Sequence, residues 1–137
     1  MRLPCLTAVA AALLTALPAS AQRLPTSVSP SHYDLAFVVD LAHERFDGTE
    51  TIRVQVAEPT TKVVLNAAEI QFREVTIGSG AAAQAATVAL DEANQTATLT
   101  VPTPLAKGAT EIHARFSGIL NSQLRGFYIS KTKLRKY

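Results

Sequence analysis

The feature that most constrains the fold is the alternation of side chains between Pro30 and Val56. Apolar residues fall at every second position of its first half, at Tyr33, Leu35, Phe37, Val39 and Leu41. In its second half, polar residues alternate with Ile52, Val54 and Val56. A period of two is typical of a strand with one buried face. We therefore expect two strands, joined at Ala42–Arg45 into a β-hairpin, with Gly48 allowing a bulge or a close backbone approach.

The rest of the chain repeats this pattern in shorter pieces. Further strands are expected at residues 62–66, 70–77, 87–90, 96–101, 111–116 and 126–129, with an irregularity near Glu74. The Ala-rich patch after Gly80 is expected to be a loop, as is the segment holding Pro102 and Pro104. Short strands at regular spacing, with no convincing helix, predict an all-β fold, an antiparallel or mixed β-sandwich of about seven or eight strands.

The first twenty-one residues have the features of a secretory signal peptide. Arg2 supplies a minimal basic start, an apolar run spans Cys5–Leu17, and Ala19-Ser20-Ala21 is a small-x-small cleavage pattern. A transmembrane anchor is the alternative, but the run is shorter than the roughly 20 residues that a helix needs to cross a bilayer. We expect cleavage after Ala21, a secreted or periplasmic protein, and no membrane association of the mature domain, residues 22–137.

Cysteine and charge narrow the possible functions. The single cysteine, Cys5, leaves with the signal peptide, so the mature chain has no disulfide and no cysteine-based metal site. Basic residues gather in the last thirteen positions, at Arg125, Lys131, Lys133, Arg135 and Lys136. A basic tail can contact nucleic acid or anionic lipid. This one lacks interleaved aromatic residues, so we expect no nucleic-acid partner and interpret it as a segment that continues into another part of a protein.

No residue pattern in the chain supports catalysis. His43-Glu44-Arg45-Phe46-Asp47 begins like the zinc-protease motif H-E-x-x-H, which needs two histidines on one helical face, but its fifth residue is Asp47 and it lies at a predicted turn. A small zinc hydrolase using His43 remains a third hypothesis, behind two given below. His32 and His113 are expected to be solvated, Gly78-Ser79-Gly80 is no phosphate loop, and Asp91-Glu92 is an exposed pair at a turn. We therefore assign no catalytic, cofactor-binding or metal-binding residue.

Six short segments occur in an order that resembles a known family. They are Arg23–Pro25, Ser29–Leu35, Phe46–Thr49, Val63–Ala67, Phe116–Leu120 and Leu124–Ser130, the last with its Gly-Phe-Tyr run. Together they resemble the N-terminal domain of the aminopeptidase N family of zinc metallopeptidases, over essentially the whole mature chain. The resemblance implies a saddle-like β-sandwich that packs against a thermolysin-like catalytic domain and helps to wall the cleft for the peptide substrate. The zinc motif of that family is absent here, so none of its functional residues can be placed on this sequence.

Two main hypotheses follow. In the first, the chain is the non-catalytic N-terminal domain, apparently truncated before the catalytic domain, of an exported enzyme that removes N-terminal residues from peptides with zinc held elsewhere. Whether the chain counts as an enzyme is then uncertain, because it resembles only part of a hydrolase. In the second, it is a free-standing secreted β-sandwich that binds protein or carbohydrate.

Overall fold

The computed structural model describes residues 23–123 and 126–131. These residues form two antiparallel sheets. The larger sheet has the strand order β1-β2-β8-β4-β5, and its members are β1 (Val28–Asp40), β2 (Arg45–Val56), β8 (Gly108–Ile119), β4 (Ile70–Ile77) and β5 (Gln84–Ala85). The smaller sheet has the order β3-β7-β6, from β3 (Thr60–Asn66), β7 (Thr96–Leu105) and β6 (Thr87–Asp91). The predicted all-β sandwich is thus confirmed.

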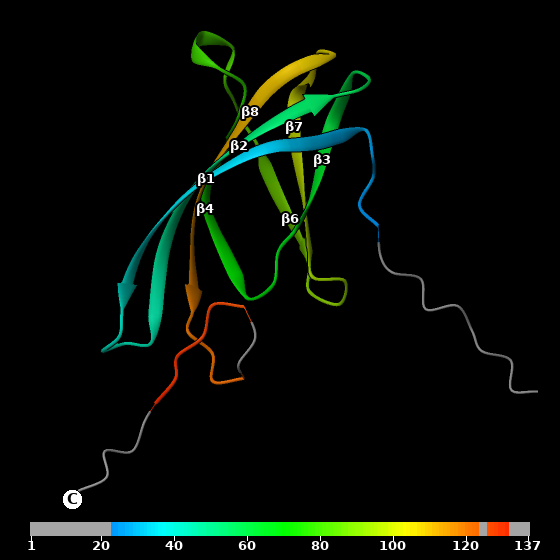
Figure 1. Cartoon of the computed structure of the whole chain (residues 1–137). Helices are drawn as coiled ribbons and strands as arrows, with labels where there is room; N and C mark the ends of the chain where they lie inside the picture. Colours follow the sequence, from blue (N-terminus) through cyan, green and yellow to red (C-terminus); the bar gives the residue numbers. More distant parts are fainter. Residues whose placement is uncertain (1–22, 124–125, 132–137) are drawn as a thin grey trace, which may run out of the picture.

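The core lies between the two sheets. From the large sheet it takes the inward positions Ile52, Val54, Val56, Val75, Ile77 and Ile112. From the small sheet it takes Val63, Leu99, Val101 and Leu105. At about 1.5–3 kcal/mol for each large apolar side chain buried, these contacts are what offsets the ordering of a chain that has no disulfide in its described part. Figure 1 shows the β1–β2 hairpin and the end of β8 reaching past the small sheet.

Several local expectations hold in detail. The hairpin joins β1 to β2 through a turn at Leu41–Glu44, and the strand at 70–77 has the predicted bounds. The register of β4 on β8 shifts between Phe72 and Glu74, which is the expected irregularity. At Gly48 the register runs without a bulge, and what approaches its backbone closely is a side chain: a Cβ there would lie 2.5 Å from the Phe116 ring.

Three expectations were wrong. Gly126–Ile129 forms only one isolated bridge, from Asn121 to Tyr128, rather than a strand. The Ala-rich patch contains a 3-10 turn at Gly80–Ala82 and the two-residue strand β5, although no longer helix forms there. The segment of Pro102 and Pro104, expected to be a loop, is instead part of β7. Residues 132–137 and the predicted signal peptide, residues 1–21, lie outside the described residues.

Beside the two prolines of β7, the Gln84 side chain makes the hydrogen bonds that a neighbouring strand would otherwise make. The pairing of β7 with β3 jumps from Thr60 opposite Leu105 to Lys62 opposite Thr100, so neither proline has to supply a ladder hydrogen bond. Thr103 lies between them, and its backbone N–H donates to Gln84 Oε1 at 2.9 Å. Gln84 Nε2 in turn donates to the Thr103 carbonyl at 3.1 Å. The amide of Gln84 therefore satisfies both backbone groups of Thr103.

Candidate interaction surface

The apolar side of β1 is exposed, although the alternation predicts that it is buried. In the antiparallel register Tyr33 lies opposite the buried Ile52 and Phe37 lies opposite Gly48, so this side of β1 is continuous with the core. No other described layer covers it, and Tyr33, Leu35, Phe37 and Val39 are 43–51% exposed. The prediction of a buried face is corrected here. β1 is the edge strand of the large sheet, and the buried positions of that sheet lie on β2, β8 and β4 instead.

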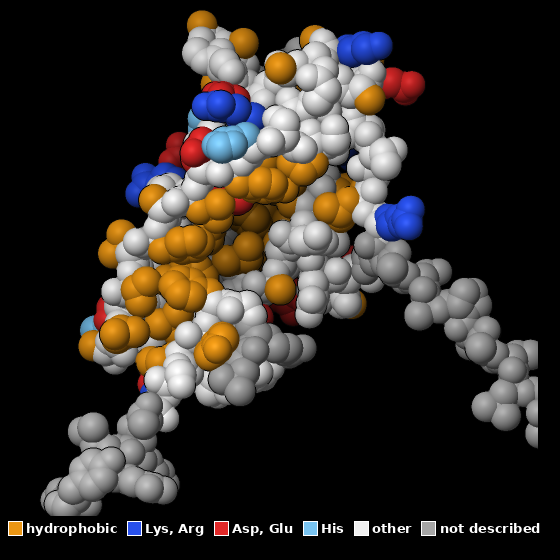
Figure 2. Space-filling view, in the orientation of Figure 1, with side chains coloured by type: hydrophobic (Ala, Val, Ile, Leu, Met, Phe, Trp, Pro, Cys, Tyr) orange, Lys and Arg blue, Asp and Glu red, His pale blue; other side chains and the backbone are white. Residues whose placement is uncertain are grey.

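We call the surface formed by Tyr33, Leu35, Phe37, Val39 and Glu50 the open face. Figure 2 shows hydrophobic side chains gathered along this side of the molecule around a hollow. Contiguous apolar patches on a protein surface mark sites of contact with another layer of protein or with a ligand. The open face is therefore the candidate functional site of the chain.

One end of the open face is packed with phenylalanine rings. Phe37 makes edge-to-face contacts with Phe46 and Phe127, with ring centroids 5.7 Å and 5.2 Å apart. Phe46 and Phe127 are closer still, at 4.9 Å. The rings fit against the sheet because glycines lie beneath them. A Cβ at Gly118 would lie 2.4 Å from the Phe46 ring, much as Gly48 makes room for Phe116.

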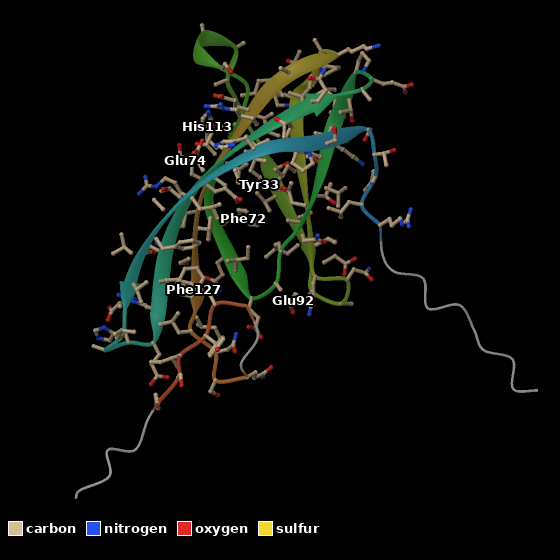
Figure 3. The ribbon with its side chains drawn as sticks, viewed as in Figure 1. Tyr33, Phe72, Glu74, Glu92, His113 and Phe127 are labelled. Carbon is tan, nitrogen blue, oxygen red and sulfur yellow. The ribbon has the colours of Figure 1, made fainter. Side chains whose placement is uncertain are left out.

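Phe127 belongs to the segment that follows β8. The Ile129 N–H donates to the Asn121 carbonyl at 2.9 Å, and Asn121 Nδ2 donates to Glu69 Oε2 at 3.3 Å. Lys131 Nζ forms an ion pair with Glu44 in the β1–β2 turn. The Gly-Phe-Tyr segment is therefore tied to the open face by Phe127 and to the hairpin end by Lys131. Figure 3 shows Phe127 nearer that end than Tyr33 and Phe72.

The other end of the open face is a cleft between the two sheets. Its volume is about 480 Å³, and its walls include Tyr33, Ile52, Val63, Leu65 and Phe72. Glu50 also lines this cleft, between Leu35 on β1 and Ala114 on β8. Burial raises the pKa of the Glu50 carboxyl above its ordinary value, because the charged form loses water.

Sequence reasoning did not single out Glu50, although one feature could have revealed it. Glu50 is in phase with Ile52, Val54 and Val56, the residues that face the core. A charged residue at an inward position of an alternating strand is informative, because carboxylates are seldom placed among apolar side chains without a partner.

Each of the three histidines has a polar partner nearby, and they do not form a common site. His43 Nδ1 lies 2.7 Å from Asp40 Oδ2, and the His43 N–H donates to Asp40 Oδ1 at 3.1 Å, so the pair closes the hairpin turn. These hydrogen bonds lower the pKa of Asp40. His32 lies 3.2 Å from Asp34, and His113 lies 3.0 Å from Thr51 Oγ1. The strands of His32 and His113 are separated by β2, so these two side chains are not brought together.

The residues do not fit a zinc ion. Within residues 23–123 and 126–131, no three His, Cys, Asp or Glu side chains are grouped closely enough to hold a metal. The H-E start at His43 lies in a turn and not on a helix, as expected. The carboxylates Asp91 and Glu92 lie at the exposed β6–β7 turn, where Asn94 donates to Asp91 and lowers its pKa. The described part of the chain also holds no helix that is long and apolar enough to cross a bilayer.

The fold and surface define a class: a β-sandwich with an uncovered apolar face and no grouped metal ligands among its described residues. Comparison with known proteins gives the family. A model of the Peptidase M1 N-terminal domain matches residues 29–136, so the chain belongs to that family. This confirms the resemblance seen in the sequence.

The chain is similar to several aminopeptidases. It is 35% identical over 106 residues to Aminopeptidase 2 of Candida albicans, covering 77% of this chain and 11% of the relative. It is 33% identical over 110 residues to Aminopeptidase N of Acetobacter pasteurianus, covering 80% and 30%. It is 37% identical over 109 residues to Aminopeptidase M1-D of rice, Oryza sativa subsp. japonica, covering 80% and 12%. The chain thus spans less than a third of the length of these relatives.

Proposed function

We propose that this chain is the non-catalytic N-terminal scaffold of an exported zinc aminopeptidase, which removes N-terminal residues from peptides. The observation that carries the proposal is the open face, in a chain that belongs to the Peptidase M1 N-terminal domain family. An apolar sheet face that is half exposed is stable in a soluble enzyme when another part of the protein covers it. We infer that the remainder of the same enzyme, which includes its catalytic domain, covers the open face and holds the zinc.

The role of the scaffold is to position the neighbouring part of the enzyme, and not to take part in the reaction. The Gly-Phe-Tyr segment is held on the open face by Phe127 and at the hairpin by the Lys131–Glu44 pair. A segment fixed in this way sets where the neighbouring part of the enzyme begins relative to the sandwich. Positioning of this kind contributes to catalysis by holding substrate-binding parts in place.

The test uses the protein encoded by the complete reading frame alongside the 137-residue chain. We expect the complete protein to contain an H-E-x-x-H motif after Tyr137, to bind zinc and to release N-terminal amino acids from peptides. The 137-residue chain is expected to release none. A reading frame that stops at Tyr137 in an intact genome would overturn the proposal and favour a free-standing module that binds protein or carbohydrate. Peptide hydrolysis or stoichiometric zinc in the short chain would favour a small zinc hydrolase instead.

Export is tested separately. The basic Arg2, the apolar run at Cys5–Leu17 and the Ala19-Ser20-Ala21 pattern support secretion or release into a periplasm. N-terminal sequencing of protein recovered outside the cytoplasm is expected to begin at Gln22. Protein that stays in the cytoplasm with Met1 in place would contradict the export proposal and leave the scaffold proposal standing.

A further inference from the structure

Charged residues on the large sheet are divided unevenly between its two sides. The outer side carries four arginines, and each pairs with an acid. Arg45 pairs with Asp40 at 3.5 Å, Arg53 with Glu111 at 3.5 Å, Arg73 with Asp47 at 3.2 Å and Arg115 with Glu74 at 3.8 Å. The inner side carries Glu50, which forms no hydrogen bond and no ion pair with the described residues. The outer side is therefore balanced in charge, and the inner side has an acid without a base.

The surroundings of Glu50 make this imbalance costly once the open face is covered. Leu35 and Ala114 flank Glu50 on the neighbouring strands, and Gly48 and Ile52 are its inward neighbours on β2. A covering layer removes the water that still reaches the carboxylate. A buried carboxylate is tolerated when it is protonated or when a cation pairs with it.

The cleft beside Glu50 has the shape and lining for a long basic side chain. Its volume of about 480 Å³ lies within the range of protein sites that accept a small organic group. Tyr33, Ile52 and Leu65 offer apolar walls, along which the methylene groups of Lys or Arg can pack while the charged head reaches the carboxylate. The exposed ring of Tyr33 is a further favourable neighbour for a cation.

We propose that Glu50 is a docking residue, and that a Lys or Arg side chain from the remainder of the same enzyme enters the cleft and pairs with it. The inference rests on the proposed function, because it requires that another part of the protein covers the open face. It adds the chemistry of the contact: one basic side chain with its stem among apolar walls, placed at the end of the open face away from the phenylalanine rings.

The test compares Glu50→Gln and Glu50→Leu in the protein encoded by the complete reading frame, by thermal unfolding of the β-sandwich. Both variants are expected to lower Tm by about 5 °C or more, because each leaves a buried cation without its partner. Glu58→Gln, at an exposed acid after β2, is the matched control and is expected to leave Tm unchanged. If Glu50→Leu raises Tm or leaves it unchanged, the covering layer is apolar at this point and the inference is overturned.

Two further measurements separate this inference from the proposed function. A hydrophobic dye such as anilinonaphthalene sulfonate is expected to bind the 137-residue chain and not the complete protein. Equal dye binding to both would show that the open face stays uncovered, and the proposed function would fail with the inference. In the 137-residue chain, Glu50→Gln is expected not to lower Tm. A loss there as large as in the complete protein would assign Glu50 a role within the sandwich and overturn the docking role alone.

Discussion

The large sheet has a covered half, β2 and β8, and an open half, the edge strand β1, and both carry apolar side chains on the same side. Ile52 and Ile112 lie beneath the small sheet and are 3% and 0% exposed. Leu35 and Phe37 lie on the same side and are 51% and 44% exposed. The difference follows the strand: Tyr33 on the edge strand β1 is 50% exposed, although it lies opposite the buried Ile52 on β2. The small sheet therefore leaves this side of β1 uncovered, whatever the sequence pattern of the strand. Alternation specifies which side of a strand is apolar, but it does not specify what lies over that side.

The largest expected effect contrasts one leucine from each half. Leu99→Ala in the 137-residue chain is expected to lower the free energy of unfolding by about 2–5 kcal/mol, because Leu99 is fully buried and leaves a cavity. Leu35→Ala is expected to cost about 1 kcal/mol or less, because its side chain is half exposed. Urea unfolding measures both. Equal losses would contradict the contrast between a covered and an open half.

A smaller effect tests the ring packing at the boundary between the halves. Gly118→Ala is expected to cost about 1–3 kcal/mol, since its Cβ would lie 2.4 Å from the Phe46 ring. The same substitution in protein that carries Phe46→Leu is expected to cost less, because the smaller side chain leaves room. A double-mutant cycle by urea unfolding measures the coupling. Strict additivity would show that the ring does not occupy the space above Gly118.

The smallest effect concerns Glu50 in the isolated chain, and its expected sign is opposite to the one proposed for the complete protein. Burial raises the pKa of Glu50 in the folded state, so at neutral pH the folded chain holds a carboxylate that it disfavours. Glu50→Gln removes that penalty and is expected to increase stability slightly at pH 7. The gain should fade as the pH drops through the folded pKa, and should vanish below the unfolded value of about 4.3, where both states are protonated.

Urea unfolding of the 137-residue chain and its Glu50→Gln variant, near neutral pH and in acid, checks this prediction. Glu58→Gln again serves as the control, because its side chain is exposed after the end of β2. A loss of stability for Glu50→Gln at neutral pH would mean that the carboxylate already has a favourable partner within the sandwich. A gain of equal size in acid would exclude ionisation as its cause.

Much of the fold could be predicted because its determinants are local. The period of two at Tyr33–Leu41 and at Ile52–Val56 specifies the hairpin, and the broken phase before Val75 specifies the register shift at Glu74. The continuation of β7 through Pro102 and Pro104 could not be predicted in this way. Prolines usually end a strand, and the compensation comes from Gln84, a contact that depends on tertiary structure.

The candidate site was less predictable than the fold. Family resemblance led to the class of protein, which the match to the Peptidase M1 N-terminal domain confirms. The open face appears only when the strand order of the large sheet is known, because Phe37 lies on its edge strand β1 and is left exposed there. Glu50 could have been found from its phase on β2, since it is the acid among the inward positions of that strand.

The amide of Gln84 has a consequence for the chemical ageing of this protein. An amide both donates and accepts, whereas a carboxylate only accepts. Hydrolysis of this one amide to a carboxylate would therefore leave the Thr103 carbonyl facing another acceptor, between two residues that have no N–H to offer. The proline-containing end of β7 thus depends on the integrity of a single side chain 19 residues upstream.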